Sequence, residues 1–167
     1  MRRVLVTGGA GFIGSHFIRI LLAEEADAQV VNLDVLTYAG NLANLADVAS
    51  SPRYRFVRGD IRDMKVAQEL AADADWIVNF AAESHVDRST KARAGEFIDT
   101  NVYGAYVMLE ATRQVNRGAR FLQVGTDEVY GDVPFPEFPN EQAMLAPSSP
   151  YSAAKAAVIN LTRAAAV

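Results

Sequence analysis

A tyrosine and a lysine, Tyr151 and Lys155, stand four positions apart near the end of the 167-residue sequence. Ser149 and Pro150 directly before them are typical of a helix start, because serine caps free N–H groups and proline at the first helical position loses no hydrogen bond. On that helix the two side chains share one face. An ammonium near a phenol stabilises the phenolate, so the pair can provide a base at neutral pH although tyrosine has an ordinary pKa of about 10. The same spacing is also common on solvated helix faces.

Three glycines near the start of the chain predict a phosphate-binding turn. Gly8, Gly11 and Gly14 lie between a short apolar run and a segment of helical period. Glycines at such a junction allow a tight turn, close approach of a pyrophosphate and close helix packing. Asp34 lies twenty residues after Gly14, at the end of the next predicted strand, where a carboxylate accepts hydrogen bonds from an adenosine ribose. A glycine-rich turn alone can be purely structural, but the combination predicts a dinucleotide site.

Asp34 also bears on which dinucleotide binds. A carboxylate there repels a 2′-phosphate, and no arginine follows at Val35 or Leu36. We therefore expect NAD rather than NADP. Asp60 and Ile61, after the third predicted strand, are candidates for contact with the adenine, although an aspartate at a strand end often serves only as a cap.

Thr126, Asp127 and Glu128 follow the fifth predicted strand. Open α/β sheets bind ligands at the carboxyl ends of their strands, so these side chains are candidates for substrate chemistry. Two neighbouring carboxyl groups can hold opposite protonation states, because like charges at close range raise one of the two pKa values. The pair can thus supply a general base and a general acid, although acids in an isolated polar loop are often merely solvated.

The elements that position these residues follow from the hydrophobic pattern. Short β-branched runs alternate with longer segments of helical period, which is typical of βαβ units and predicts an α/β fold with a doubly wound parallel sheet and helices on both faces. The predicted strands are 4–7, 29–34, 54–58, 75–80 and 120–125, and helices are expected after the glycine turn, at about 64–72 and 97–117, and from Pro150. The apolar stripes expected to cover the sheet are Ile13, Phe17, Ile20 and Leu21 on the first helix and Val102, Tyr106, Leu109 and Val115 on the third.

Composition excludes several classes of protein. Half of the residues are apolar, which suffices for one core and is little for two complete domains. The net charge of -4 and the lack of a basic run argue against nucleic acid as a partner. The sequence has no cysteine and only two histidines, His16 and His85, so we predict neither disulfides nor a metal site. The apolar run after Met1 is too short for a signal peptide or a membrane span, so we expect a cytoplasmic location and no membrane partner.

The glycine turn combined with Tyr151-x-x-x-Lys155 resembles the extended short-chain dehydrogenase/reductase superfamily, with its Rossmann-type fold. The resemblance implies that Tyr151 is the acid/base at a sugar hydroxyl. It further implies that Lys155 holds the nicotinamide ribose and lowers the pKa of the tyrosine, and that Thr126 binds the reacting oxygen. The segment 126–131, Thr-Asp-Glu-Val-Tyr-Gly, is similar to dTDP-glucose 4,6-dehydratases, whereas 4-epimerases carry serine-rich sequence there. Segments 36–41, 81–89 and 100–102 are similar to the same dehydratases.

That similarity implies a reaction on a nucleotide sugar, dTDP-glucose, with NAD as the cofactor. The sugar is oxidised at C4, loses water across C5 and C6, and receives the hydride back at C6. Glu128 is the implied base for the C5 proton, and protonated Asp127 assists loss of the C6 hydroxyl. A related NAD-dependent 4-epimerase and a catalytically idle NAD-binding module remain the alternatives.

The resemblance also implies the full set of site residues. Candidate cofactor-binding residues are Gly8, Gly11, Phe12, Ile13, Gly14, Asp34, Leu36, Thr37, Asp60, Ile61, Phe80, Ala81, Ala82, Ser84, Thr100, Tyr151 and Lys155. Candidate substrate-binding residues are Ser84, His85, Thr126, Asp127 and Glu128.

The resemblance finally bears on domain organisation and assembly. Members of the superfamily continue for about as many residues again, so we expect residues 1–167 to form an NAD-binding Rossmann domain that is incomplete relative to the family, with the substrate domain absent from this chain. Relatives pair through helices equivalent to 97–117 and the helix of Tyr151, so we expect a homodimer.

Overall fold

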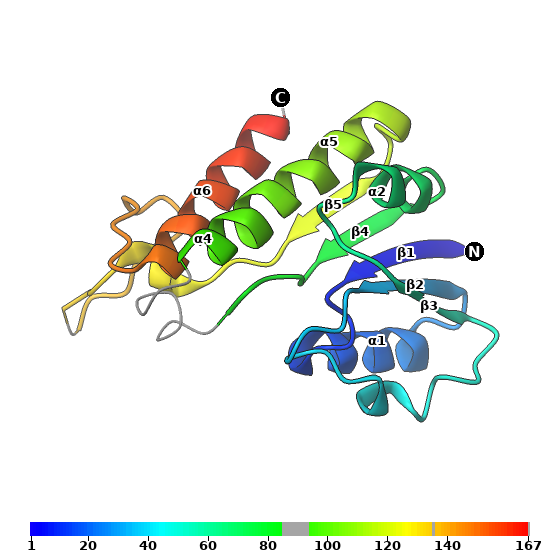
Figure 1. Ribbon diagram of the computed structural model, residues 1–167. Helices are drawn as coiled ribbons and strands as arrows, with labels where there is room; N and C mark the ends of the chain where they lie inside the picture. Colours follow the sequence, from blue (N-terminus) through cyan, green and yellow to red (C-terminus); the bar gives the residue numbers. More distant parts are fainter. Residues whose placement is uncertain (85–93, 135, 167) are drawn as a thin grey trace.

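The computed structural model describes residues 1–84, 94–134 and 136–166. Its centre is a five-stranded sheet with the strand order β3-β2-β1-β4-β5, and every neighbouring pair is parallel (Figure 1). The strands are β1 (Arg2–Thr7), β2 (Ala28–Asp34), β3 (Tyr54–Arg58), β4 (Trp76–Asn79) and β5 (Arg120–Gln123). This order has the Rossmann pattern, in which the chain changes direction across the sheet between β1 and β4. The predicted fold class is confirmed.

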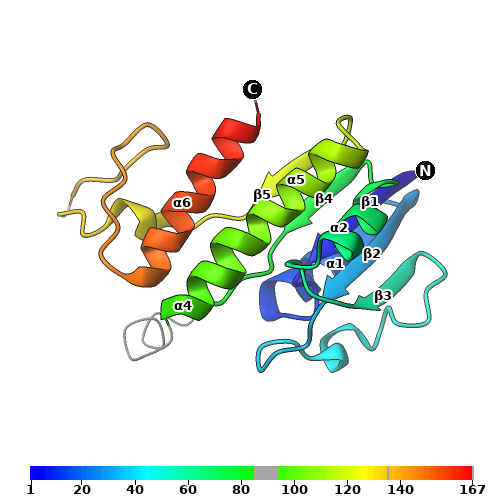
Figure 2. The same cartoon turned by 45° about the horizontal axis from the view of Figure 1, so that its top comes forward.

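Helices cover both faces of the sheet. The helices and helical turns of the described residues are α1 (Phe12–Glu24), the 3-10 turn η1 (Leu42–Leu45), α2 (Met64–Ala71), α4 (Ala94–Phe97), the π-helix η2 (Ile98–Gly104), α5 (Ala105–Val115), the 3-10 turn η3 (Asp127–Tyr130) and α6 (Pro150–Ala165). Figure 2 shows α1 on one face and α2 and α5 on the other, with α6 beside α5. Within residues 1–84, 94–134 and 136–166, no helix is long and apolar enough to cross a membrane.

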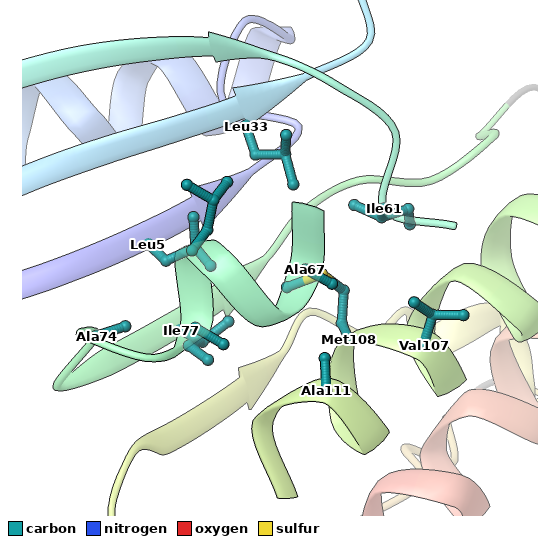
Figure 3. Packing of buried hydrophobic residues seen from close by; sticks show 11 residues of the cluster. Leu5, Leu33, Ile61, Ala67, Ala74, Ile77, Val107, Met108 and Ala111 are labelled. Atoms are coloured by element: carbon teal, nitrogen blue, oxygen red, sulfur yellow. The ribbon is translucent and has the colours of Figure 1, made fainter. Parts of the chain in front are cut away.

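Alternate residues of the strands build two separate cores, one on each face. Leu5 and Ile77 point toward α2 and α5, where they join a buried cluster that includes residues of both helices (Figure 3). Val4, Val6 and Val78 point the other way and pack with α1 and η1. Strands buried on both sides explain the nearly continuous apolar runs of the sequence.

The face of α1 that packs on the sheet includes only half of the predicted stripe. Phe17 and Leu21 pack against the core and Ile18 and Leu22 are buried, whereas Ile13 and Ile20 are 64% and 49% exposed. The cause is Gly14 in the first turn, where an added Cβ would collide with the main chain of the glycine turn. This close approach sets the rotation of the helix about its axis, so the buried positions follow Gly14 at intervals of four.

The stripe predicted for 97–117 is also wrong in part. Val102 in η2 packs against a buried cluster, but Tyr106 and Val115 on α5 are 45% and 41% exposed, and Val107, Met108 and Ala111 are among the fully buried side chains of α5. The preceding π-helix η2 explains the difference. A π-turn contains more residues than an α-turn, so the regular period assumed for 97–117 shifts by about one position before α5 begins.

Candidate active site

A cleft of about 800 Å³ runs along the carboxyl ends of the strands and reaches α6. It lies where the strand order reverses between β1 and β4, which is the usual ligand site of open α/β sheets. The predicted cofactor-binding residues that line it are Gly8, Gly11, Phe12, Ile13, Gly14, Asp34, Thr37, Asp60, Ile61, Phe80, Ala81, Ala82, Ser84, Thr100, Tyr151 and Lys155. Leu36 is not part of the lining, and His85 lies outside the described residues.

At Gly8 and Gly14 of the glycine turn, main-chain atoms leave no room for a side chain. Gly8 has a positive φ of 69°, and an added Cβ would lie 2.6 Å from the main-chain nitrogen of Ala81. At Gly14 an added Cβ would collide with the carbonyl oxygen of Gly8. Gly11 precedes the first turn of α1 and provides no side-chain cap, so the first N–H groups of the helix are left to other acceptors. These features fit a pyrophosphate, which needs close main-chain approach and free N–H donors.

Asp34 at the end of β2 is held by two main-chain donors. Its Oδ2 accepts a hydrogen bond from the N–H of Ala10 at 2.9 Å, and its Oδ1 accepts one from the N–H of Leu36 at 2.8 Å. Leu36 reaches this position with a φ of 59°, which is uncommon for a residue with a side chain. A carboxylate accepts about four hydrogen bonds, so Asp34 keeps acceptor positions for the hydroxyls of a ribose.

Tyr151 and Lys155 lie in the first turns of α6, where the predicted helix start is confirmed. Ser149 is the N-cap, Pro150 opens the helix, and a reciprocal pair of hydrogen bonds with Ser152 forms a capping box. Both site residues are buried, with 9% and 5% of their surfaces exposed, although they also line the cleft. The ring of Phe97 contacts Tyr151 edge-on at a centroid distance of 6.3 Å.

The electrostatics of this pair differ from the prediction. Lys155 Nζ donates a hydrogen bond to the carbonyl oxygen of Val124 at 2.7 Å. Burial, and after it the charge of Glu128, raises the pKa of Tyr151 above its ordinary value, while Thr126 acts in the opposite sense. Burial also lowers the pKa of Lys155. The expected decrease in the pKa of the tyrosine is therefore not observed in this structure.

The two predicted acids stand beside the cleft at its Tyr151 end, not in its lining. Thr126 is the N-cap of η3, and its Oγ1 accepts a hydrogen bond from the N–H of Glu128 at 3.3 Å. Asp127 and Glu128 are exposed, and both raise the pKa of Tyr151 through their charge. In the described part of the chain, no three side chains that could ligate a metal lie together.

A buried asparagine that the sequence did not single out as a site residue holds one wall of the cleft. Asn101 in η2 is 3% exposed and clamps the main chain of Glu83. Its Oδ1 accepts from the N–H of Glu83 at 2.8 Å, and its Nδ2 donates to the carbonyl oxygen of the same residue at 2.9 Å. The clamp fixes the segment after β4, and π-turns of this kind often mark functional positions.

A row of polar side chains joins three strands at their carboxyl ends. Thr7, Asn79 and Gln123 occupy matching positions on β1, β4 and β5. The Thr7 hydroxyl donates to Asn79 Oδ1, and Asn79 Nδ2 donates to Gln123 Oε1 at 2.7 Å. This row links β1, which precedes the glycine turn, to β5. The residue after β5 is Val124, which accepts the hydrogen bond from Lys155.

Further residues line the cleft without having been predicted to do so. They are Leu33, Val35, Tyr38, Ala39, Gly40, Gly59, Arg62, Glu83, Glu96, Val124 and Gly125. Most are neighbours of predicted residues, so the spacing of the strand ends could have suggested them. Arg62 is different, because nothing in its local sequence indicates that its side chain faces a ligand.

Comparison with curated proteins finds relatives of about twice the length. The low-salt glycan biosynthesis protein Agl12 of Haloferax volcanii is 54% identical over 160 residues, which are 96% of this chain and 50% of the relative. The dTDP-glucose 4,6-dehydratase of Streptomyces niveus is 50% identical over 159 residues, which are 93% of this chain and 46% of the relative. The chain thus spans about half the length of the curated relatives it matches.

Solved structures of the same fold contain the cofactor predicted here. The dTDP-glucose 4,6-dehydratase DesIV of Streptomyces venezuelae, crystallised with NAD and TYD, is 51% identical with a TM-score of 0.91, over 97% of this chain and 51% of that one. The UDP-Glc/GlcNAc 4-epimerase of Campylobacter jejuni is 28% identical with a TM-score of 0.89, over 99% of this chain and 49% of that one. The family model of GDP-mannose 4,6 dehydratase matches residues 5–166. The chain therefore belongs to the GDP-mannose 4,6 dehydratase family.

Proposed function

We propose that residues 1–167 form the NAD-binding domain of a dTDP-glucose 4,6-dehydratase. The glycine turn and the first N–H groups of α1 would hold the pyrophosphate, and Asp34 would hold the adenosine ribose. Lys155 would exchange its hydrogen bond with the Val124 carbonyl for hydroxyls of the nicotinamide ribose. The Asp34 carboxylate, fixed by two main-chain donors, favours NAD over a cofactor with a 2′-phosphate.

The observation that carries the catalytic proposal is that two carboxylates beside the cleft act on a tyrosine that lines it. Tyr151 and Lys155 line the same cleft as the glycine turn, and the charges of Asp127 and Glu128 act on Tyr151. NAD supplies a hydride acceptor when it is bound. Tyr151 would take the proton of the C4 hydroxyl, Glu128 would remove the C5 proton, and Asp127 would protonate the departing C6 hydroxyl.

A 4-epimerase is the competing activity, because it uses the same cofactor and fold. Epimerisation at C4 requires no elimination, so it has no need of two adjacent carboxyl groups. Asp127 and Glu128 stand together in the first turn of η3, and the charges of both act on Tyr151, which favours the dehydratase. The higher identity to dehydratases than to the epimerase points the same way.

One experiment separates these possibilities. The chain is incubated with dTDP-glucose and NAD, mass spectrometry follows loss of one water, chromatography follows epimerisation at unchanged mass, and calorimetry measures NAD binding. A dehydrated product that disappears in Glu128→Gln supports the dehydratase, and an epimer supports the alternative. NAD binding without either product indicates a cofactor-binding module whose chemistry needs residues outside this chain.

We also propose that the protein forms a homodimer through η2 and α5, which make up the predicted helix 97–117, together with α6. The elements η2 and α5 expose the apolar or aromatic side chains Ile98, Tyr103, Tyr106 and Val115. The ring centroids of Tyr103 and Tyr106 lie 6.1 Å apart, so two of these exposed side chains are neighbours. Light scattering coupled to size-exclusion chromatography tests the proposal, and a monomer at all working concentrations would exclude it.

A further inference from the structure

We infer that Arg62 is a positioning residue for recognition of the adenine. It holds the Asp60 carboxylate where one free acceptor position faces the 6-amino group of the base. The inference rests on the proposed NAD site and adds a determinant of base specificity to it.

Arg62 fixes Asp60 with three different N–H groups. Its main-chain N–H donates to Oδ1 at 2.9 Å, its Nε donates to both carboxylate oxygens at 3.0 Å, and Nη2 donates to Oδ2 at 2.6 Å. These bonds outweigh the effect of partial burial, so the pKa of Asp60 is lowered and the group is ionised at neutral pH. Nε shares a single N–H between the two oxygens, so the three N–H groups occupy about three of the roughly four acceptor positions of the carboxylate and one remains.

Strand order places this carboxylate beyond the ribose site. Asp34 ends β2 and Asp60 follows β3, which is the next strand outward from the centre of the sheet. The N–H of Gly59 donates to the carbonyl oxygen of Asp34 at 3.1 Å, so the two strand ends are joined. A dinucleotide that has its pyrophosphate at β1 and its ribose at β2 extends its base toward β3. Asp60, Ile61 and Arg62 all line the cleft there.

The chemistry of an ionised carboxylate selects one kind of base edge. It accepts hydrogen bonds and donates none, so it suits the amino group of adenine and repels the carbonyl oxygen that hypoxanthine has at the same position. A free Asp60 side chain would rotate between solvent and the cleft. The planar guanidinium fork of Arg62 removes that freedom, which a lysine ammonium cannot do because it lacks the fork.

Arg62 also affects the overall charge of the cleft, and this effect must be separated from positioning. Asp60, Glu83 and Asp99 all interact with its charge. Removing the arginine makes the site more negative and weakens binding of any dinucleotide, whatever its base. Only a change in the preference between bases reports on positioning.

The test is calorimetric titration with NAD and with nicotinamide hypoxanthine dinucleotide. It compares the wild-type chain with Arg62→Ala, Arg62→Lys and Asp60→Asn, and uses Arg55→Ala as control, since Arg55 is an exposed arginine of β3 outside the cleft lining. The wild type should prefer NAD by about 10- to 100-fold, as expected for a hydrogen bond to a charged group. Arg62→Ala and Arg62→Lys should both lose most of that preference, Asp60→Asn should abolish it, and Arg55→Ala should keep it.

The outcomes distinguish this inference from the proposed function. If Arg62→Ala weakens both dinucleotides equally and keeps the wild-type preference, Arg62 acts through charge alone and the inference is wrong while the NAD site stands. If the wild type binds the two dinucleotides equally, the inference is also wrong. If the wild type binds neither, the proposed function fails and the inference fails with it.

Discussion

Gly8→Ala is the substitution whose effect follows most directly from the structure. Its φ of 69° lies in the left-handed region, which costs a residue with a side chain about 1–2 kcal/mol. The added Cβ would also lie 2.6, 2.7 and 2.9 Å from main-chain atoms of Ala81 and Phe80, and such overpacking costs about 1–3 kcal/mol. The lower entropy of the unfolded alanine chain offsets about 0.4–1 kcal/mol. We expect a net loss of about 2–4 kcal/mol in the free energy of unfolding.

Urea denaturation measures this loss, and calorimetry measures NAD binding in the same variant. Relief of the collision requires the end of β1 to move away from the segment after β4, so the cleft must change and NAD affinity should fall by at least about tenfold, or 1.4 kcal/mol. Gly95→Ala is the control, because an added Cβ there meets nothing within 4 Å and alanine favours the helix α4. Equal stability and affinity of Gly8→Ala and wild type would refute the close approach on which the proposed pyrophosphate site depends.

Three further predictions concern residues around the cleft and the sheet. Asn101→Ala removes the hydrogen bonds to both main-chain polar groups of Glu83. It should lower the free energy of unfolding, measured by urea denaturation, by about 2–4 kcal/mol and should weaken NAD binding. Unchanged stability and affinity would exclude the clamp. Arg53→Ala removes hydrogen bonds to three carbonyl oxygens at the end of α1 and should cost about 1.5–3 kcal/mol, whereas Arg55→Ala should change stability by less than about 0.5 kcal/mol. Since burial and the charge of Glu128 raise the pKa of Tyr151, its contribution to stability is complete below about pH 10 and is lost as the pH rises through the raised value. As the pH rises above about 10, the free energy of unfolding of Tyr151→Phe should therefore fall less than that of the wild type. If urea denaturation gives parallel curves of unfolding free energy against pH for the two proteins, the pKa of Tyr151 is not raised.

Local spacing was sufficient to predict the parts of the site that lie near one another in sequence. The glycine turn, Asp34 and the capped start of α6 each depend on a few neighbouring residues, and the structure has them as predicted. The helix faces were mispredicted because they depend on packing between distant segments. On α1 two apolar stripes compete, and close contact of Gly14 with the glycine turn decides between them.

Residues with partners far along the chain could not be predicted from the sequence. Asn101 and Glu83 are 18 positions apart, and Asn101 lies in a π-helix that the amino-acid pattern did not predict. Lys155 and its acceptor Val124 are 31 positions apart. Tertiary packing brings these groups together, so the sequence indicated which residue types were available but not which atoms they bind.

The raised pKa of Tyr151 links the acid and base functions of the proposed site. Burial opposes formation of the phenolate first, followed by the negative charges of Glu128 and Asp127. Lys155, which could offset them, is bound to the Val124 carbonyl, and burial lowers its own pKa. A positive charge that enters the cleft beside the phenol would oppose these negative charges and lower the pKa of Tyr151, so the acid/base role proposed for Tyr151 should depend on the charge of the bound cofactor.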